Sequence, residues 1–291
     1  MALGEKTVAK LVALVDGSAY TQSVCDHAAW VAQRTGAAVE LLHVLGRREV
    51  ASAPTNLSGN ITLGARTALL EELSTLDEQR AKLAQKRGRA ILDDAKAMLE
   101  ADGVAEVTTR LRIGDVVETV SEIEGEIDMV VVGKRGEAAD FAKLHLGSNL
   151  ERVVRSCHRP VFVASRAFKP IGSILIAYDG GTSSMKAVDH IARSPLFAGL
   201  KCRLLTVGPD NEENRKRLDN AHAALKAGGY DVDVQIVPGQ PEAVICQAVE
   251  ADGFDLLVMG AYGHSRIRSL VIGSTTTEMV RSCKIPIVLF R

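Results

Sequence analysis

Glycine and hydroxyl residues stand at fixed spacing near the C-terminus, in a pattern that suits a phosphate chain. Gly260 and Gly263 are three residues apart, and nine residues separate Gly263 from Gly273, which precedes Ser274 and Thr275. Glycines at the end of a strand let the backbone approach a ligand, and positive φ aims their N–H groups inward. A helix that opens at Ser274 offers free amides and a favourable dipole to an anion. The spacing therefore favours a cradle for a di- or triphosphate.

The middle of the chain carries a second copy of this pattern, which consists of Gly133, Gly136, Gly147, Ser148 and Asn149. Here ten residues instead of nine separate the second and third glycines. In both copies an apolar run precedes the first glycine, and Arg-Ser-Cys followed by another apolar run ends the stretch. Loops tolerate single insertions, so whether this copy binds a ligand stays open.

Strand and helix patterns alternate around both copies. In the first half the apolar runs predict strands at 10–15, 39–45, 107–113, 128–133 and 160–164. In the second half they predict strands at 173–179, 202–207, 232–237, 254–260 and 285–290. Helical patterns separate the strands, which is typical of an α/β protein. We expect two tandem doubly wound domains, each a five-stranded parallel sheet with helices on both faces.

An aspartate ends the first predicted strand of each half, at Asp16 and at Asp179. In such sheets ligands bind at the carboxyl ends of the strands, near the point where strand order reverses. The aspartate could then bind a ribose hydroxyl or a metal held by phosphates, although a turn or capping role is the alternative. Gly181 replaces the serine of the first half, and we expect Thr182 to cap the helix instead.

These residues give the chain a resemblance to tandem universal stress proteins of the ATP-binding type, whose signature is G-x2-G-x9-G-[S/T]. The C-terminal stretch GAYGHSRIRSLVIGS matches that spacing, and the resemblance covers nearly the whole chain. It implies ATP, with or without Mg2+, as the ligand. In the second half it implies Asp179 beside the adenosine, Val207 at the adenine edge, Met259 in the base pocket, Gly260, Gly263, Gly273, Ser274 and Thr275 around ribose and phosphates, and His264 and Arg266 on the spacer. The matching positions of the first half are Asp16, Val44, Val132, Gly133, Gly136, Gly147, Ser148 and Asn149.

The first half is longer than the second, because it carries an insertion between its second and third strands. The two aspartates are 163 residues apart, but Gly133 and Gly260 only 127, which leaves about 36 extra residues. We expect domains at 1–168 and 169–291, with an inserted loop and long helix at about 46–101. A leucine stripe lies along one face of that helix, at Leu69, Leu73, Leu76 and Leu83. Packing on its own domain is the simplest interpretation, and a dimer contact or a surface for a small apolar ligand is the alternative.

Composition excludes several classes of protein. The formal net charge is −1, so no basic surplus indicates nucleic acid. No apolar run approaches the roughly 20 residues that span a bilayer, and the N-terminus does not read as a signal peptide, so we expect a cytoplasmic protein without a membrane partner. The five cysteines show no C-x-x-C spacing, which predicts buried packing residues and no metal site.

No catalytic constellation is present in the sequence. It lacks a G-x4-G-K-[S/T] loop, an H-E-x-x-H pair and a G-x-S-x-G elbow. Slow ATP hydrolysis or autophosphorylation near Ser274 is the most that the residues suggest. A lone histidine at His43 is more typical of packing than of a ligand, and Lys134 reads as a solvated loop charge or, alternatively, a phosphate contact.

The leading hypothesis is an ATP-binding stress-response regulatory module. We expect its two domains to pair within the chain, and homodimer formation is a further expectation. The alternative is a nucleotide-independent scaffold or small-ligand-binding dimerisation protein that uses the 51–101 region. An enzyme acting on an adenylated substrate is a third hypothesis.

Overall fold

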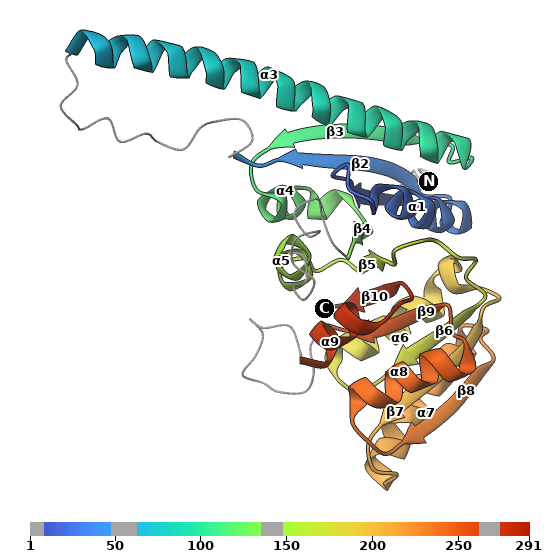
Figure 1. Cartoon of the computed structure of the whole chain (residues 1–291). Helices are drawn as coiled ribbons and strands as arrows, with labels where there is room; N and C mark the ends of the chain where they lie inside the picture. Colours follow the sequence, from blue (N-terminus) through green and yellow to red (C-terminus); the bar gives the residue numbers. More distant parts are fainter. Residues whose placement is uncertain (1–8, 48–62, 135–147, 262–273) are drawn as a thin grey trace, which may run out of the picture.

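The computed structural model describes residues 9–47, 63–134, 148–261 and 274–291. Within these ranges ten strands form one sheet in the order β3-β2-β1-β4-β5-β10-β9-β6-β7-β8 (Figure 1). The strands of the first half are β1 (Lys10–Leu14), β2 (Ala38–Leu45), β3 (Val107–Ile113), β4 (Met129–Gly133) and β5 (Val161–Ala164). Those of the second half are β6 (Ser173–Ala177), β7 (Lys201–Val207), β8 (Val232–Val237), β9 (Leu256–Gly260) and β10 (Ile287–Phe290). Each half is parallel and has the same order of strands, so the predicted doubly wound fold is confirmed.

Helices cover both faces of this sheet. One face carries α1 (Thr21–Thr35), α3 (Leu63–Ala101), α6 (Thr182–Arg193) and α7 (Glu212–Ala227). The other face carries α4 (Val116–Ile123), α5 (Ser148–Ser156), α8 (Pro241–Asp252) and α9 (Ser274–Ser282). Short 3-10 turns are η1 (Glu124–Glu126) and η3 (Pro195–Phe197). The hydrophobic cluster on each face contains residues of both halves, so each layer of the core continues from one half into the other.

Local sequence explains where several helices begin and end. The Asp115 carboxylate accepts hydrogen bonds from the N–H groups of Val117 and Glu118, at 2.9 and 3.2 Å, and so caps α4. Pro241 opens α8, where its missing N–H costs nothing. Gly36 ends α1 with a φ of +70°, a conformation that glycine adopts readily.

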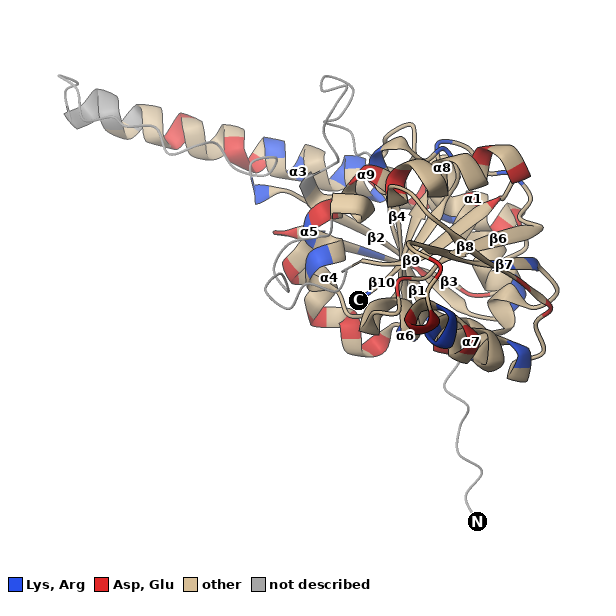
Figure 2. Cartoon of the chain, turned by 90° about the horizontal axis from the view of Figure 1, so that it is seen from below, with Lys and Arg blue, Asp and Glu red and all other residues tan. Residues whose placement is uncertain are grey.

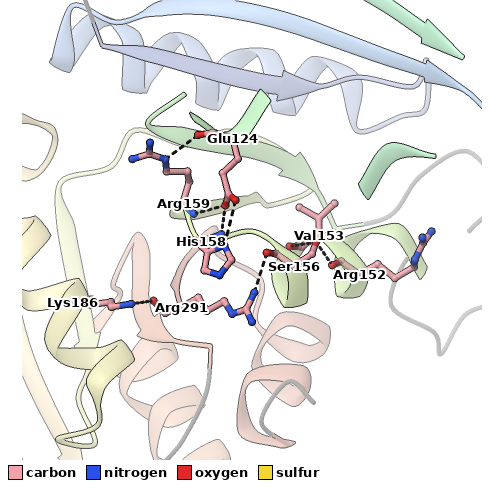
Figure 3. Close-up of polar contacts among 8 residues, drawn as sticks. All are labelled: Glu124, Arg152, Val153, Ser156, His158, Arg159, Lys186 and Arg291. Carbon is pink, nitrogen blue, oxygen red and sulfur yellow. Dashed lines mark hydrogen bonds and ion pairs between the residues drawn. The ribbon is translucent and has the colours of Figure 1, made fainter. Parts of the chain in front are cut away.

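The two halves meet where β5 and β10 pair in antiparallel orientation, with Phe162 opposite Val288. Polar contacts surround this seam (Figure 3). The Arg291 guanidinium, just after β10, donates to the carbonyl of Ser156 at the end of α5, at 2.9 Å. In turn Lys186 donates to the Arg291 carbonyl at 2.9 Å. The C-terminal residue thereby links α5 of the first half to α6 of the second.

Lys134 also connects the halves, in a way that neither sequence interpretation anticipated. Its ammonium donates to the carbonyls of Cys283 and, at 3.4 Å, Ile285, just beyond α9. Burial lowers the pKa of Lys134 below its usual range. Cys283 and its counterpart Cys157 are both buried at helix ends, as predicted. Lys134 is thus a partly buried cation at the seam between the halves.

Helix α3 has two parts with different surroundings. Its C-terminal part packs on the sheet through the buried residues Gly88, Leu92, Ala95 and Leu99. Its N-terminal part extends beyond the ends of β2 and β3 (Figure 1). There Leu69, Leu76 and Leu83 are 39%, 49% and 69% exposed. The prediction that the leucine stripe packs on its own domain is therefore wrong for these three residues.

Membrane spans and metal sites can be assessed for the described residues. None of the helices described is long and apolar enough to cross a membrane. Among the same residues, no group of three or more His, Cys, Asp or Glu side chains has an arrangement that would hold a metal ion.

Candidate functional site

The turn after β6 puts Asp179 at the carboxyl edge of the second-half sheet. The next residue, Gly180, has a φ of +74°, which side chains rarely adopt. The Asp179 carboxylate accepts hydrogen bonds from the Gly181 N–H at 2.8 Å and from the Ser184 hydroxyl at 2.6 Å. Gly181 is the N-cap of α6 and no side chain caps it, so the prediction that Thr182 does so is wrong. Asp179 instead fastens this turn to the first turn of α6.

Gly260 ends β9, the strand that pairs directly with β6. A β-carbon placed on Gly260 would lie 2.9 Å from the Ser183 Cβ and 3.0 Å from the Ser184 nitrogen. These distances are shorter than an ordinary van der Waals contact. Thr276 of α9 donates to the Gly260 carbonyl at 3.2 Å. The first glycine of the pattern thus allows α6 and β9 to approach closely at the predicted crevice.

Helix α9 begins at Ser274, which is exposed, so its free N–H groups lie just after the glycine pattern. The hydroxyl of Thr275 donates to the Glu242 carboxylate at 2.8 Å. Glu242 belongs to the first turn of α8, so the start of one helix holds an acidic group beside the start of the other. A carboxylate is favourable at a helix N-terminus, and here it accepts a hydrogen bond from a hydroxyl that the sequence pattern assigns to the phosphate cradle.

Val207 and Met259 lie near the carboxyl ends of the two strands that flank β6, and both contact the same hydrophobic cluster. Val207 is the last residue of β7, and the pairing between β6 and β7 ends two residues earlier, at Leu205. The main-chain edge of Val207 that faces β6 therefore lies past the last paired residue. Met259 is 5% exposed and packs in the cluster that contains α8 and α9. It is a core residue of that face, close to the end of β9.

Several predicted site residues lie outside the described residues. In the second half these are Gly263, His264, Arg266 and Gly273. In the first half they are Gly136 and Gly147, and of Ser148 the structure describes the start of α5 alone.

The turn after β1 repeats the geometry of the turn after β6. Gly17 has a φ of +74°, the same value as Gly180. The Asp16 carboxylate accepts a hydrogen bond from the Ser18 N–H at 3.0 Å. The duplicated sequence has therefore kept the same backbone conformation at both strand ends.

The two turns differ in the helix that covers them. A β-carbon on Gly17 would lie 2.8 Å from Cδ1 of Ile91, on α3. A β-carbon on Gly180 would lie 2.8 Å from Cδ of Arg217, on α7. Arg217 also forms an ion pair with Glu213 at 2.5 Å. The first turn is thus covered by an apolar side chain and the second by the stem of a cation.

His43 and Thr206 hold the turns at equivalent positions on the neighbouring strands. Nδ1 of His43 lies 2.7 Å from the Val15 carbonyl oxygen, and the Thr206 hydroxyl donates to the Tyr178 carbonyl at 2.9 Å. His43 is 7% exposed, which confirms a packing role. Each of these residues directly precedes the predicted adenine-edge residue of its half, which is Val44 in the first.

The remaining first-half residues lie at the ends of β4 and α5. Val132 and Gly133 are partly buried at the end of β4, and Asn149 is exposed in the first turn of α5. In the same helix Arg152 forms an ion pair with Asp115 at 2.7 Å. The hydrogen bond from Arg152 lowers the pKa of the Asp115 carboxyl below its usual range.

Sequence reasoning missed three charged residues beside the predicted crevices, namely Arg152, Arg217 and Glu242. The sequence positions of two of them could have indicated their place beside a helix start. Glu242 follows the proline that opens its helix, and Arg152 lies one helical turn after Ser148. Arg217 gave no such signal, because its position over Gly180 depends on how α7 packs on the sheet.

Comparisons with known proteins agree with this architecture. A family model described as the Universal stress protein family matches residues 8–165 and 207–291. Universal stress protein Slr1230 of Synechocystis is 38% identical over 279 residues, which cover 95% of this chain and 97% of that protein. A universal stress protein structure from Archaeoglobus fulgidus matches 97% of this chain and 98% of its own length, with a TM-score of 0.71 and 18% identity. A universal stress protein solved in complex with cAMP matches 42% of this chain and 98% of its own, at 26% identity and a TM-score of 0.37.

Proposed function

The chain belongs to the universal stress protein family, and on this premise we propose that it is an ATP-binding regulatory module of the stress response. Its nucleotide site is the crevice of the second half, at the carboxyl ends of β6, β7 and β9. We take the two units to be residues 1–168 and 169–291. Binding of ATP at the second unit changes how the chain contacts its partners.

The observation that carries this proposal is the convergence of three features at one edge of the sheet. The turn at Asp179 and Gly180, the end of β9 at Gly260 and the start of α9 at Ser274 come from neighbouring elements. Thr276 links the last two, because it belongs to α9 and bonds the Gly260 carbonyl. A nucleotide needs a base edge, a ribose partner and phosphate donors together, and this edge offers candidates for all three.

Each group of the site has a task in this proposal. The carboxylate of Asp179 accepts from a ribose hydroxyl, and the main chain of Val207 meets the adenine edge. Amides after Gly260 and at the start of α9 donate to phosphate oxygens, with Gly263, Gly273 and Ser274 completing the cradle. Mg2+, where it accompanies the nucleotide, would be held mainly by the phosphates.

The charges near the two turns favour nucleotide binding in the second half. Arg217 brings a cation over the turn at Gly180, whereas Ile91 covers the equivalent turn at Gly17. A cation close to a triphosphate strengthens its binding, especially where water is partly excluded. The second half also retains the nine-residue spacing of the signature, while the first half has ten residues.

Calorimetric titration of nucleotide-free, full-length protein with ATP tests this proposal. We expect one strong site in the wild type, and Gly273→Val should abolish it by placing a side chain where phosphate lies. Gly147→Val is the matched control, since it makes the same change in the first half and should leave binding intact. Equal ATP affinity of the wild type and Gly273→Val would show that the proposed site is wrong.

The exposed leucines of α3 favour a second candidate function. Leu69, Leu76 and Leu83 form a surface that the rest of the described chain leaves largely open, and large exposed apolar groups mark interaction sites. In this alternative the chain is a scaffold whose contacts need no nucleotide. Shortening the N-terminal part of α3 should then abolish partner binding while ATP titrations stay unchanged.

A further inference from the structure

We propose that the N-terminal part of α3 pairs in antiparallel orientation with the same helix of a second copy of this chain. This inference rests on the second candidate function and names its partner. It concerns residues 69–89, which we call the α3 arm. ATP binding at the second half does not depend on it.

The apolar stripe of the α3 arm points away from the chain's own core. Leu69, Leu76 and Leu83 recur at steps of seven residues, with Leu73 four residues after the first. Leu69, Leu76 and Leu83 thus fill one of the two seam positions of a coiled coil, and Leu73 begins the other, which continues with Arg80 and Arg87. At 100° per residue, the stripe is rotated by about 120° from the face that packs on the sheet through Leu92 and its neighbours. The arm therefore presents its seam to solvent without obstruction from its own sheet.

The charge pattern of the α3 arm indicates which helix pairs with it and in which orientation. From Leu69 to Gln79 every charged residue is acidic, and from Arg80 to Leu92 every charged residue is basic. The acidic residues are Glu71, Glu72, Asp77 and Glu78, and the basic ones are Arg80, Lys82, Lys86, Arg87 and Arg89. Figure 2 shows the same division, with red segments farther from the sheet and blue segments nearer to it.

A second arm in antiparallel orientation complements this pattern along its whole length. It sets the acidic part of each helix beside the basic part of the other, whereas parallel pairing sets like charges together. The arrangement has two-fold symmetry, which closes the assembly at two copies. Opposite charges on a self-complementary helix thus point to a second copy as the partner.

The register follows from aligning the leucines. When Leu73 packs against Leu83 of the second copy, the symmetry axis passes close to Glu78. Glu72, next to Leu73, then lies beside the seam, about 3 Å along the helix from the level of Lys86 of the second copy. Both side chains are exposed, and neither forms an ion pair with another described residue. Gln79 lies one residue from the axis, so the two copies of this residue are only about 3 Å apart along the helix direction. Glu72 lies about 20 Å along the axis from its own copy, at 1.5 Å per residue.

Sedimentation of the full-length protein between about 1 and 100 µM tests whether the arm pairs. We expect a reversible dimer in the wild type. Leu76→Ala should raise its dissociation constant at least about 100-fold, because two leucines per dimer lose their buried contacts. Circular dichroism checks that this variant keeps its fold, which we expect since Leu76 is 49% exposed. A monomer throughout, or a dimer unaffected by Leu76→Ala, overturns the proposal.

Charge exchange and cross-linking test the orientation. Glu72→Lys and Lys86→Glu should each weaken the dimer by roughly 2- to 10-fold, and the double variant should recover the wild-type affinity. Gln79→Cys should form an intermolecular disulfide readily, while Glu72→Cys, the matched control, should not. Absence of recovery in the double variant, or equal cross-linking of the two cysteine variants, overturns the antiparallel register. ATP titrations of the same variants should match the wild type. They separate failure of this inference from failure of the proposed nucleotide site.

Discussion

Replacing Gly260 with alanine tests whether the first glycine of the pattern serves the packing of α6. The new β-carbon would lie 2.9 Å from the Ser183 Cβ and 3.0 Å from the Ser184 nitrogen, and both atoms belong to the helix itself. A normal contact needs about 3.5–4.0 Å between carbon atoms, so the start of α6 must move by roughly half an ångström or more. Such overpacking costs about 1–3 kcal/mol, and the smaller unfolded-state entropy of alanine offsets about 0.4–1 kcal/mol of it.

We therefore expect Gly260→Ala to lower the free energy of unfolding by about 1–2 kcal/mol, which corresponds to a fall in Tm of about 2–8 °C. Urea unfolding and thermal melts of the full chain measure this. Gly125→Ala is the matched control, because nothing lies within 4 Å of its β-carbon and its φ is not positive, so its stability should change by less than about 0.5 kcal/mol. If Gly260→Ala is as stable as the wild type but loses ATP affinity, the glycine serves the ligand alone and the packing argument is refuted.

Two further predictions concern buried and acidic side chains. Burial lowers the pKa of His27 to about 4, below the value near 6.5 in the unfolded chain. Above pH 6.5 His27 is neutral in both states, so the folded state keeps its full stability. As the pH falls towards 4 the unfolded chain takes up the proton first, and the free energy of unfolding decreases. Urea unfolding should show about 3 kcal/mol lost over this range, and His27→Leu should lack that part of the pH dependence; an identical pH profile in the variant would contradict the assignment. Glu242→Gln should tighten ATP binding by about 2- to 5-fold, because it removes a negative charge beside the start of α9. Glu250→Gln, on the same helix but paired with Lys284, serves as the control, and weaker ATP binding by Glu242→Gln would mean that the carboxylate positions Thr275 for the ligand.

The alternation of strands and helices could be predicted because it follows from local sequence patterns. Strands buried on both faces of a parallel sheet appear as continuous apolar runs, such as that from Leu11 to Val15. The turn after the first strand of each half carries an Asp-Gly pair, and Gly17 and Gly180 do adopt the positive φ that this pairing favours. Here the chemistry of a few neighbouring residues is sufficient to decide the local structure.

Contacts between distant elements could not be predicted in the same way. The leucine stripe of α3 has the spacing of a core face, but the buried face of this helix is formed by Gly88, Leu92, Ala95 and Leu99. Spacing shows that a helix is amphipathic and does not show what it contacts. Lys134 likewise looks like a loop charge in the sequence, and it bonds carbonyls of the other half. The pairing of β5 with β10 brings those groups together, and no local pattern encodes that pairing.

The helix between the second and third strands differs between the two halves, and so does the side chain that it places over the turn after the first strand. The long helix α3 stands where the second half has α7, since each connects the second and third strands of its half. Gly88 lets α3 come close to the ring of His43, and its Ile91 lies over the turn at Gly17. At the equivalent turn of the second half, Arg217 of α7 places a cation over Gly180, which in the proposed function favours phosphates there. Helix α3 also carries the exposed arm, so it both covers the turn at Gly17 and provides the surface through which we propose that two copies pair.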